Sequence, residues 1–288
     1  MSILETKNLT YIYGEGTPFE KKAVNNVNIK IEQGELIGIM GHTGSGKSTF
    51  VQMLNGLIKP HSGQVLLNGK DIWEKPKEIK KIRFQVGMVF QYPEYQLFEE
   101  TVYKDIAFGP KNMGLSDEEV DKSVRRAARF VGLKDELLNK SPFDLSGGEK
   151  RRAAIAGVIA MEPEVLILDE PTAGLDPVGR NVLLSQISQY QKAKNNTVIL
   201  VSHSMEDVAR VTNKVMVMNK GELAMYGNTQ DVFAKSTELS KMGLRVPQIT
   251  RVTDALREKG INLPSGILTV DRAVHEITEL LKKEGKLK

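Results

Sequence analysis

Cysteine is absent from this 288-residue sequence. Disulfide bonds, thiol nucleophiles and cysteine-ligated metal sites are therefore excluded. The first residues, Met1 to Glu5, lack the basic and then apolar pattern of a secretion signal, so we expect no cleaved leader. No apolar run approaches the roughly 20 residues that a membrane-spanning helix needs. We therefore expect that any membrane-spanning part of its working assembly belongs to another chain.

The sequence also has no dense basic run. It contains 40 basic and 36 acidic residues, a net charge of +4. Such a small excess argues against nucleic acid as a partner. Two interpretations stay open, a mildly basic cytosolic protein or one that works near anionic lipid. A hydrophobic content of 40% and a charged content of 26% are typical of a globular protein with its own core.

Short apolar runs separated by helical patterns predict an α/β core. The predicted strands are residues 36–40, 64–67, 86–90, 165–168 and 198–201. The last two are continuously apolar, which is typical of the centre of a parallel sheet.

Residues 92–145 differ from this pattern and predict a helical insertion. Ser116 and Glu119 form a capping-box pattern at the start of one helix. An apolar stripe follows at Val120, Val124, Ala127, Ala128 and Val131.

The character changes again after about residue 228, where residues 246–260 and a run from Thr269 predict two more helices. We therefore divide the chain into a core (1–91 and 146–228), a helical insertion (92–145) and a C-terminal extension (229–288).

A glycine-rich loop follows the predicted strand 36–40 and precedes a predicted helix. It matches G-x-x-x-x-G-K-[ST], whose backbone N–H groups close around phosphate oxygens at a helix N-terminus. The nucleotide-binding residues predicted here are Gly41, His42, Thr43, Gly44, Ser45, Gly46, Lys47, Ser48 and Thr49. Lys47 is expected to reach the β- and γ-phosphates, and the Ser48 hydroxyl to bind Mg²⁺. His42 occupies a variable position of the motif, and we interpret it as a bystander in catalysis.

Two carboxylates, Asp169 and Glu170, end the apolar strand 165–168. Successive side chains of a strand point to opposite sides, so the two should not share one role. Asp169 is predicted to bind magnesium, directly or through water. Glu170 is predicted to act as general base on the attacking water.

A second anion site is predicted where Leu145-Ser146-Gly147-Gly148-Glu149 precedes a helix over residues 150–160. Ser146, Gly147 and Gly148 present N–H donors at a helix N-terminus. Because the first loop already covers this chain's own nucleotide, the second site is predicted to hold the γ-phosphate of a nucleotide bound to a partner.

Three further residues complete the predicted site. His203 follows the strand 198–201, where a neutral imidazole can hydrogen-bond a γ-phosphate or orient the water. Gln91 follows the strand 86–90, where an amide can touch Mg²⁺ or water. Tyr13 is the predicted stacking partner of adenine, with Tyr11 as the competing candidate and core packing as the alternative role.

Together these motifs resemble an ATP-binding-cassette ATPase over roughly residues 3–228, in that family's order and spacing. The resemblance implies a P-loop NTPase core with a parallel-rich sheet, an antiparallel β subdomain, an inserted helical subdomain and a small C-terminal extension. It also implies ATP and Mg²⁺, bound between two ATPases. Glu149 departs from the pattern, since glutamine is commoner there, and this puts the strength of a contact with the nucleotide sugar in doubt.

Residues 13–20, 92–98 and 108–112 look like the second ATPase type of energy-coupling-factor transporters, which take up vitamins or transition metals. That resemblance implies a heterodimer with a second cassette ATPase, at the cytoplasmic face of the cell membrane. The pair would sit beneath a membrane scaffold subunit that joins a substrate-binding membrane subunit. A non-transport cassette ATPase of DNA repair or translation is the alternative. It is disfavoured because no zinc cysteines, long insertion or second cassette is present.

The resemblance also suggests roles for two surfaces. Residues 92–100, which we call the aromatic-acidic segment, are predicted to line a groove for a scaffold helix, with Glu94, Glu99 or Glu100 pairing with an arginine. A solvated acidic loop is the alternative. The extension 229–288 is predicted to support ATPase pairing through Val274, Ile277 and Leu281, unless these residues form a core of their own.

Overall fold

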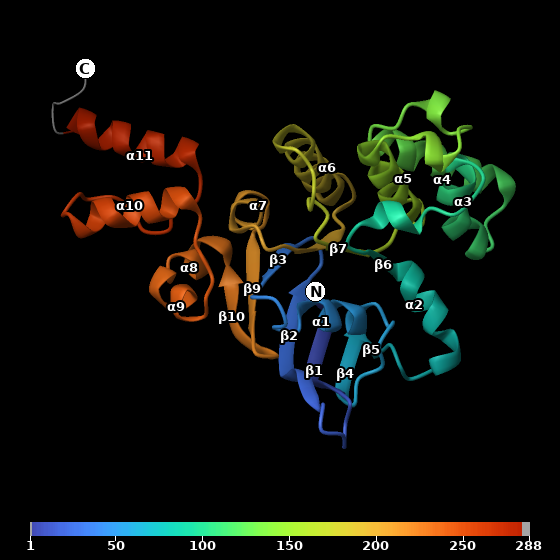
Figure 1. Ribbon diagram of the computed structural model, residues 1–288, viewed down its shortest axis with the longest axis horizontal. Helices are drawn as coiled ribbons and strands as arrows, with labels where there is room; N and C mark the ends of the chain where they lie inside the picture. Colours follow the sequence, from blue (N-terminus) through green and yellow to red (C-terminus); the bar gives the residue numbers. More distant parts are fainter. Residues whose placement is uncertain (1, 284–288) are drawn as a thin grey trace.

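The computed structural model describes residues 2–283 and contains two sheets (Figure 1). The larger sheet has six strands in the order β10-β9-β3-β8-β7-β6, and all neighbours are parallel except β9 and β10. Its strands are β3 (Leu36–Met40), β6 (Val86–Val89), β7 (Val165–Asp169), β8 (Thr197–Val201), β9 (Lys214–Asn219) and β10 (Glu222–Asn228). Every residue of β3, β6, β7 and β8 is buried, as the continuous apolar runs predicted.

The smaller sheet is antiparallel, with the order β2-β1-β4-β5. Its strands are β1 (Ser2–Tyr13), β2 (Lys21–Glu32), β4 (Ser62–Leu67) and β5 (Lys70–Asp71). The fold is therefore the α/β fold expected from the sequence, with an antiparallel unit beside a parallel-rich sheet.

Eleven α-helices lie within the described residues. They are α1 (Lys47–Leu54), α2 (Ile79–Gln85), α3 (Val102–Asn112), α4 (Asp117–Phe130), α5 (Gly147–Ile159), α6 (Pro177–Lys194), α7 (Met205–Val211), α8 (Thr229–Phe233), α9 (Ser236–Lys241), α10 (Gln248–Glu258) and α11 (Val270–Lys283). Within residues 2–283, none of these helices combines the length and the apolar character that crossing a bilayer requires.

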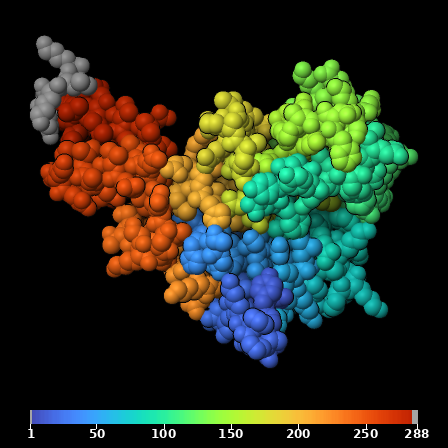
Figure 2. Space-filling model, in the orientation of Figure 1, coloured from blue at the N-terminus to red at the C-terminus, as the bar shows by residue number. Residues whose placement is uncertain are grey.

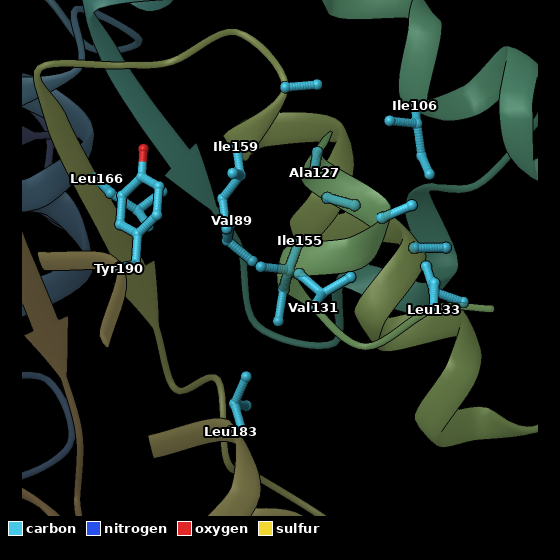
Figure 3. Packing of buried hydrophobic residues seen from close by; sticks show 14 of the residues in the cluster. Val89, Ile106, Ala127, Val131, Leu133, Ile155, Ile159, Leu166, Leu183 and Tyr190 are labelled. Carbon is cyan, nitrogen blue, oxygen red and sulfur yellow. The ribbon is translucent and has the colours of Figure 1, made fainter. Parts of the chain in front are cut away.

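The central sheet separates two apolar clusters. On one face, α1 and the antiparallel sheet pack together through buried side chains such as Phe50 and Met53. On the other face, helices α3 to α6 pack against β6, β7 and β8. Figure 3 shows Ile155 and Ile159 of α5 between Leu166 of β7 and the helical residues Ala127 and Ile106. The sheet is thus held rigidly from both sides.

Helix α4 begins as the sequence predicted. The Ser116 side chain accepts from the Glu119 N–H at 3.4 Å, and the Glu119 carboxylate accepts from the Ser116 N–H at 2.9 Å. Helix α5 packs on α3 and α4, although it begins at Gly147, beyond the expected end of the insertion. The helical unit therefore extends past residue 145, because the apolar face of α5 is covered by α3 and α4.

The extension contains two structurally different parts. Helices α8 and α9 pack against α7 and β9 through Phe233, Leu239 and Val246, so the α/β core continues past residue 228. Helices α10 and α11 surround a small cluster of their own that includes Ile267 and Ala273. Figure 2 shows this part (orange to red) projecting away from the helical unit (green).

The predicted apolar stripe of α11 is divided between two environments. Ala273, Ile277 and Leu280 pack into the cluster of the extension itself. Val270 and Val274 remain exposed. An internal core therefore covers one side of the helix, and the other side is exposed.

We expect Phe233→Ala to destabilise the whole chain, because Phe233 is 0% exposed and joins the extension to the core. The expected loss is about 3–5 kcal/mol of unfolding free energy. Phe19→Ala is the matched control, since Phe19 is 87% exposed and its truncation should leave stability almost unchanged. Urea unfolding of both variants measures the difference, and equal midpoints would contradict this packing.

Candidate functional site

The glycine-rich loop connects β3 to α1 and has a backbone that only glycine accommodates at Gly46. This residue has φ +100°, and a Cβ added there would lie 2.1 Å from the Ala23 carbonyl oxygen. The close approach to β2 holds the loop at the start of α1, where successive N–H groups face the same side. The local sequence therefore fixes a phosphate cradle.

Four strand ends converge on this cradle. β3 leads into the loop, β6 leads to Gln91, β7 ends at Asp169, and β8 leads to His203. Because the carboxyl ends of parallel strands meet at one edge of a sheet, side chains from distant segments line a single cavity of about 240 Å³. Its lining residues are Thr43, Gly44, Gly46, Lys47, Ser48, Thr49, Gln91, Asp169, Glu170 and His203.

Lys47 is buried in this cavity and is held by its own loop. Its Nζ donates to the carbonyl oxygens of Gly41 at 2.8 Å and of His42 at 3.1 Å. Burial lowers the Lys47 pKa, and the nearby carboxylates of Glu170 and Asp169 oppose that shift. The hydrogen bonds of the Lys47 ammonium group thus go to neutral carbonyl oxygens, which a phosphate would replace.

The His42 side chain turns back to its own loop. Its Nδ1 lies 2.7 Å from the Thr43 carbonyl oxygen, and His42 does not line the cavity. The catalytic site thus takes its imidazole from His203 rather than from His42.

Asp169 and Glu170 both line the cavity but differ in backbone conformation. β7 ends at Asp169, and Glu170 has a left-handed backbone with φ +52°. The Glu170 N–H donates to the Val201 carbonyl at 3.0 Å, which fixes this turn against β8. The expectation that both residues lie in a regular strand is therefore wrong, because the chain turns after Asp169.

The two carboxylates also differ electrostatically. Burial raises the Asp169 pKa, while a hydrogen bond from Ser48 and the charge of Lys47 oppose this. Burial raises the Glu170 pKa to about 7, a rise that Asp169 reinforces, and a backbone hydrogen bond from His203 opposes. The Glu170 carboxylate is therefore less acidic than an exposed one and readily takes up a proton.

His203 lies beside Glu170, with Nε2 at 3.3 Å from Glu170 Oε1. This contact is not a hydrogen bond, and the buried Oε1 has no hydrogen-bond donor among the described residues. Burial and the charge of Lys47 lower the His203 pKa, which keeps the imidazole neutral near pH 7. The site thus holds a buried acceptor oxygen and a neutral ring next to each other.

Tyr13 lies at the edge of the site, where its hydroxyl is 3.2 Å from Thr49 Oγ1. Its ring is exposed on one side. Tyr11, the competing candidate, packs edge-on against both Tyr13 and His61 and is partly buried. Between the two tyrosines, only Tyr13 presents an open ring face.

Ser146, Gly147 and Gly148 begin α5 and do not line the cavity. Ser146 caps the helix reciprocally with Glu149, whose carboxylate accepts from the Ser146 N–H at 2.9 Å. A Cβ added at Gly147 would meet no atom within 4 Å, so this helix start faces open space. Hydrogen bonds from Ser146 lower the pKa of Glu149. Glu149, the residue that differs from the family pattern, therefore serves as the second half of the helix cap.

The structure reveals one residue that sequence reasoning missed, Arg151. Its guanidinium binds Glu94 through two hydrogen bonds and donates to the carbonyl oxygens of Pro171 and Ala173. Burial alone would raise the Glu94 pKa, but the bonds from Arg151 outweigh it and lower that pKa. Nothing in a single sequence distinguishes this arginine from its neighbour Arg152, because the partners come from distant segments.

The Glu94–Arg151 contact changes the expectation for the aromatic-acidic segment. Glu94 was one of three alternative carboxylates expected to pair with a scaffold arginine, and an arginine of the same chain already pairs with it. Glu100 pairs with Lys104 at the surface. Glu99 has no ion pair among the described residues, so it is the carboxylate most free to meet an incoming cation.

The oxygen donors in the cavity fit magnesium. Within residues 2–283 no group of three His, Cys, Asp or Glu side chains forms a metal cage. Ser48, Gln91 and Asp169 instead offer a hydroxyl, an amide and a carboxylate in one cavity, and Ser48 already hydrogen-bonds Asp169. Mg²⁺ prefers few protein oxygens, with phosphates and water completing its shell.

Comparisons with known proteins agree with this geometry. The family profile described as ABC transporter matches residues 24–173. The curated protein "Energy-coupling factor transporter ATP-binding protein EcfA2" from Clostridium tetani is 53% identical over 98% of both chains. The protein of the same name from Clostridium acetobutylicum is 55% identical over 97% of this chain and 98% of its own.

Solved structures show the same fold. The structure of cbiO1 from Clostridium perfringens, described as part of the ABC transporter complex cbiONQ, is 41% identical. It matches with a TM-score of 0.75 over 88% of this chain and 99% of its own. The ATP-binding cassette MJ0796 in a dimeric post-hydrolysis state with ADP and Pi is 28% identical, with a TM-score of 0.71 over 78% and 98% of the two chains. This chain therefore belongs to the ABC transporter family and, within it, to the energy-coupling factor transporter ATP-binding proteins.

Proposed function

We propose that this chain hydrolyses ATP to drive a vitamin or transition-metal importer, as one of two related cassette ATPases beneath membrane subunits. One observation carries the proposal: a phosphate cradle, a buried lysine and two consecutive carboxylates at the end of β7 surround one cavity. The names of the relatives support transport as the process, and the name of cbiO1 describes it as part of a transporter complex.

In this proposal the phosphates of ATP lie in the loop 41–49, with Lys47 at the β- and γ-phosphates and Tyr13 against adenine. Ser48, Gln91 and Asp169 hold Mg²⁺, which when bound offsets the charge of the phosphate oxygens. Lys47 leaves the Gly41 and His42 carbonyls to contact phosphate. The chain thereby exchanges neutral partners for charged ones, which favours binding.

Glu170 accepts a proton from the attacking water. Its buried Oε1 lacks a hydrogen-bond donor among the described residues, and its pKa of about 7 lies close to the working pH. A general base with such a pKa is both deprotonated often enough and basic enough to act. Neutral His203, 3.3 Å from Glu170, orients the water or the γ-phosphate.

Ser146, Gly147 and Gly148 complete the site of a partner ATPase. They lie outside this chain's cavity and begin a helix whose N-terminus faces open space. A γ-phosphate bound to the partner supplies the anion that such a terminus favours. The two ATPases then close on ATP and separate after hydrolysis, because only the γ-phosphate contacts both half-sites.

A groove on the helical unit receives the membrane scaffold. It is a cavity of about 530 Å³ lined by residues of α2, α3, α5 and the aromatic-acidic segment, with apolar walls from Phe98, Phe108 and Met161. Tyr95 beside it is 85% exposed, a large apolar surface to leave in water. A scaffold helix with apolar residues matches the apolar walls of this groove, and a cation on that helix can meet Glu99, which follows the lining residue Phe98 in the chain.

The extension supports pairing with the second ATPase, since Val252, Val270 and Val274 are exposed on α10 and α11. Pairing there and scaffold docking at the groove place the chain at the cytoplasmic face of the membrane as a peripheral subunit.

Glu170→Gln tests the catalytic role. We expect the variant to bind ATP normally and to lose roughly 10² or more in turnover, the contribution of a general base. Turnover is measured in the assembled complex with the partner's own hydrolytic site silenced, so that only the site on this chain reports. Near-normal turnover would refute the role of Glu170.

Ser146→Ala tests the composite site against a matched control. Ser116 makes the same capping box on α4 as Ser146 does on α5. Both alanine variants should lose about 1 kcal/mol of stability through the cap. Only Ser146→Ala should slow hydrolysis at the site built on the partner's glycine-rich loop. Equal turnover in the two variants would exclude a contact with the partner's nucleotide.

Single-cysteine variants test the scaffold groove. The chain has no native cysteine, so Tyr95→Cys and Phe98→Cys each introduce one unique thiol. In the assembled complex, a thiol-reactive photo-crosslinker should join both to the scaffold subunit. Phe19→Cys, equally exposed but on the β1–β2 connection, serves as the control. A scaffold adduct from Phe19→Cys alone would place the docking surface elsewhere.

A further inference from the structure

We infer that Arg151 is a positioning residue that makes the placement of Glu170 depend on the aromatic-acidic segment. The inference rests on the proposed function, in which that segment contacts the membrane scaffold. It concerns how binding of a scaffold helix in the groove could change the position of Glu170, which lies outside that groove.

Arg151 connects three segments through one guanidinium. Its Nε donates to Glu94 Oε2 at 3.1 Å and its Nη2 to Glu94 Oε1 at 2.7 Å. Its Nη1 donates to the carbonyl oxygens of Pro171 at 3.2 Å and Ala173 at 2.5 Å. Arg151 belongs to α5, Glu94 to the aromatic-acidic segment, and Pro171 and Ala173 to the loop that follows Glu170.

The loop 170–176 is fixed on its other side by the core. The Thr172 hydroxyl donates to Asp207 Oδ2 at 2.9 Å, and Arg180 Nε donates to both oxygens of Asp207 at 2.7 and 2.9 Å. Asp207 lies on α7, which begins just after His203. The loop is therefore held between a fixed contact on the core and the Arg151 contact on the helical unit.

The Glu94–Arg151 contact is the part of this arrangement that can respond to a partner. The Arg151 and Glu94 side chains are only 5% and 17% exposed, so the charge of Arg151 depends on Glu94 for neutralisation. Glu94 lies on a short turn, Pro93–Gln96, between the exposed rings of Tyr92 and Tyr95. A scaffold helix that displaces these two rings would also displace Glu94. The Arg151 guanidinium would then move with the Glu94 carboxylate that neutralises its charge.

The consequence reaches the catalytic carboxylate directly. Pro171 is the residue after Glu170, so a shift of Arg151 pulls on the carbonyl adjacent to the base. A lysine at position 151 offers no planar fork and could not hold a carboxylate and two carbonyls in this arrangement. Small displacements of reacting groups change reaction rates strongly. A small movement of Glu170 caused by Arg151 is therefore sufficient to couple scaffold docking with hydrolysis.

A double-mutant cycle tests this inference in the assembled complex with both ATPases and the membrane subunits. The variants are Arg151→Gln, Glu94→Gln and the double variant. Arg126→Gln is the matched control, because Arg126 also makes an ion pair between elements of the helical unit, at 2.9 Å with Glu162. The measurements are kcat and KM for ATP, binding of a fluorescent ATP analogue, and thermal stability.

We expect Arg151→Gln to lower kcat roughly 10- to 100-fold with little change in KM or analogue binding. Glu94→Gln should act in the same direction, and the double variant should be no slower than Arg151→Gln, because removal of Arg151 already abolishes its contact with Glu94. Hydrogen exchange at residues 170–176 should increase in both single variants and stay unchanged in Arg126→Gln. Glu94→Gln keeps the size of the side chain and one acceptor oxygen for Arg151, and it provides a second variant even if Arg151→Gln is unstable.

Three results would overturn the inference. The first is a kcat within about twofold of wild type in both single variants. The second is multiplication of their separate effects in the double variant. The third is a loss of kcat that follows thermal stability, with unchanged exchange at residues 170–176. Failure of the proposed function is distinguishable, because the wild-type complex would then neither bind the analogue nor hydrolyse ATP.

Discussion

The convergence of four parallel strand ends on one cavity is the constraint on which the site depends. β3, β6, β7 and β8 are buried along their whole length, and apolar clusters fix them from both faces of the sheet. The residues that follow these strands therefore have no freedom to separate. A cradle, an amide, two carboxylates and an imidazole reach the same space because backbone hydrogen bonds between strands put them there.

Burial gives the cavity its chemistry. Lys47, Asp169 and Glu170 lie where water screens charge poorly, so each pKa departs from its ordinary value. The two carboxylates are suited to different partners. Ser48 and Lys47 oppose the rise of the Asp169 pKa, so this carboxylate suits a cation, whereas Glu170 has a buried oxygen without a hydrogen-bond donor among the described residues and suits a proton. The turn after Asp169 separates these two environments within one residue.

Sequence alone predicted the features that depend on local or periodic patterns. The glycine-rich loop and the cap at Ser116 follow from spacing, because their hydrogen bonds join residues near each other in the chain. The buried strands follow from their continuous apolar runs. The left-handed turn at Glu170 was missed, since its cause is a hydrogen bond to Val201 on a different strand. Arg151 was missed for the same reason. The end of the core was placed too early, because Phe233 and Leu239 belong to short helices without a strong period.

The contact between Lys47 and the carbonyls of its own loop has a consequence for the binding of each new nucleotide. A loop that fills its own centre with an ammonium group keeps its shape between one nucleotide and the next. Binding of the next nucleotide then requires rotation of the Lys47 side chain and no rearrangement of the glycine-rich loop.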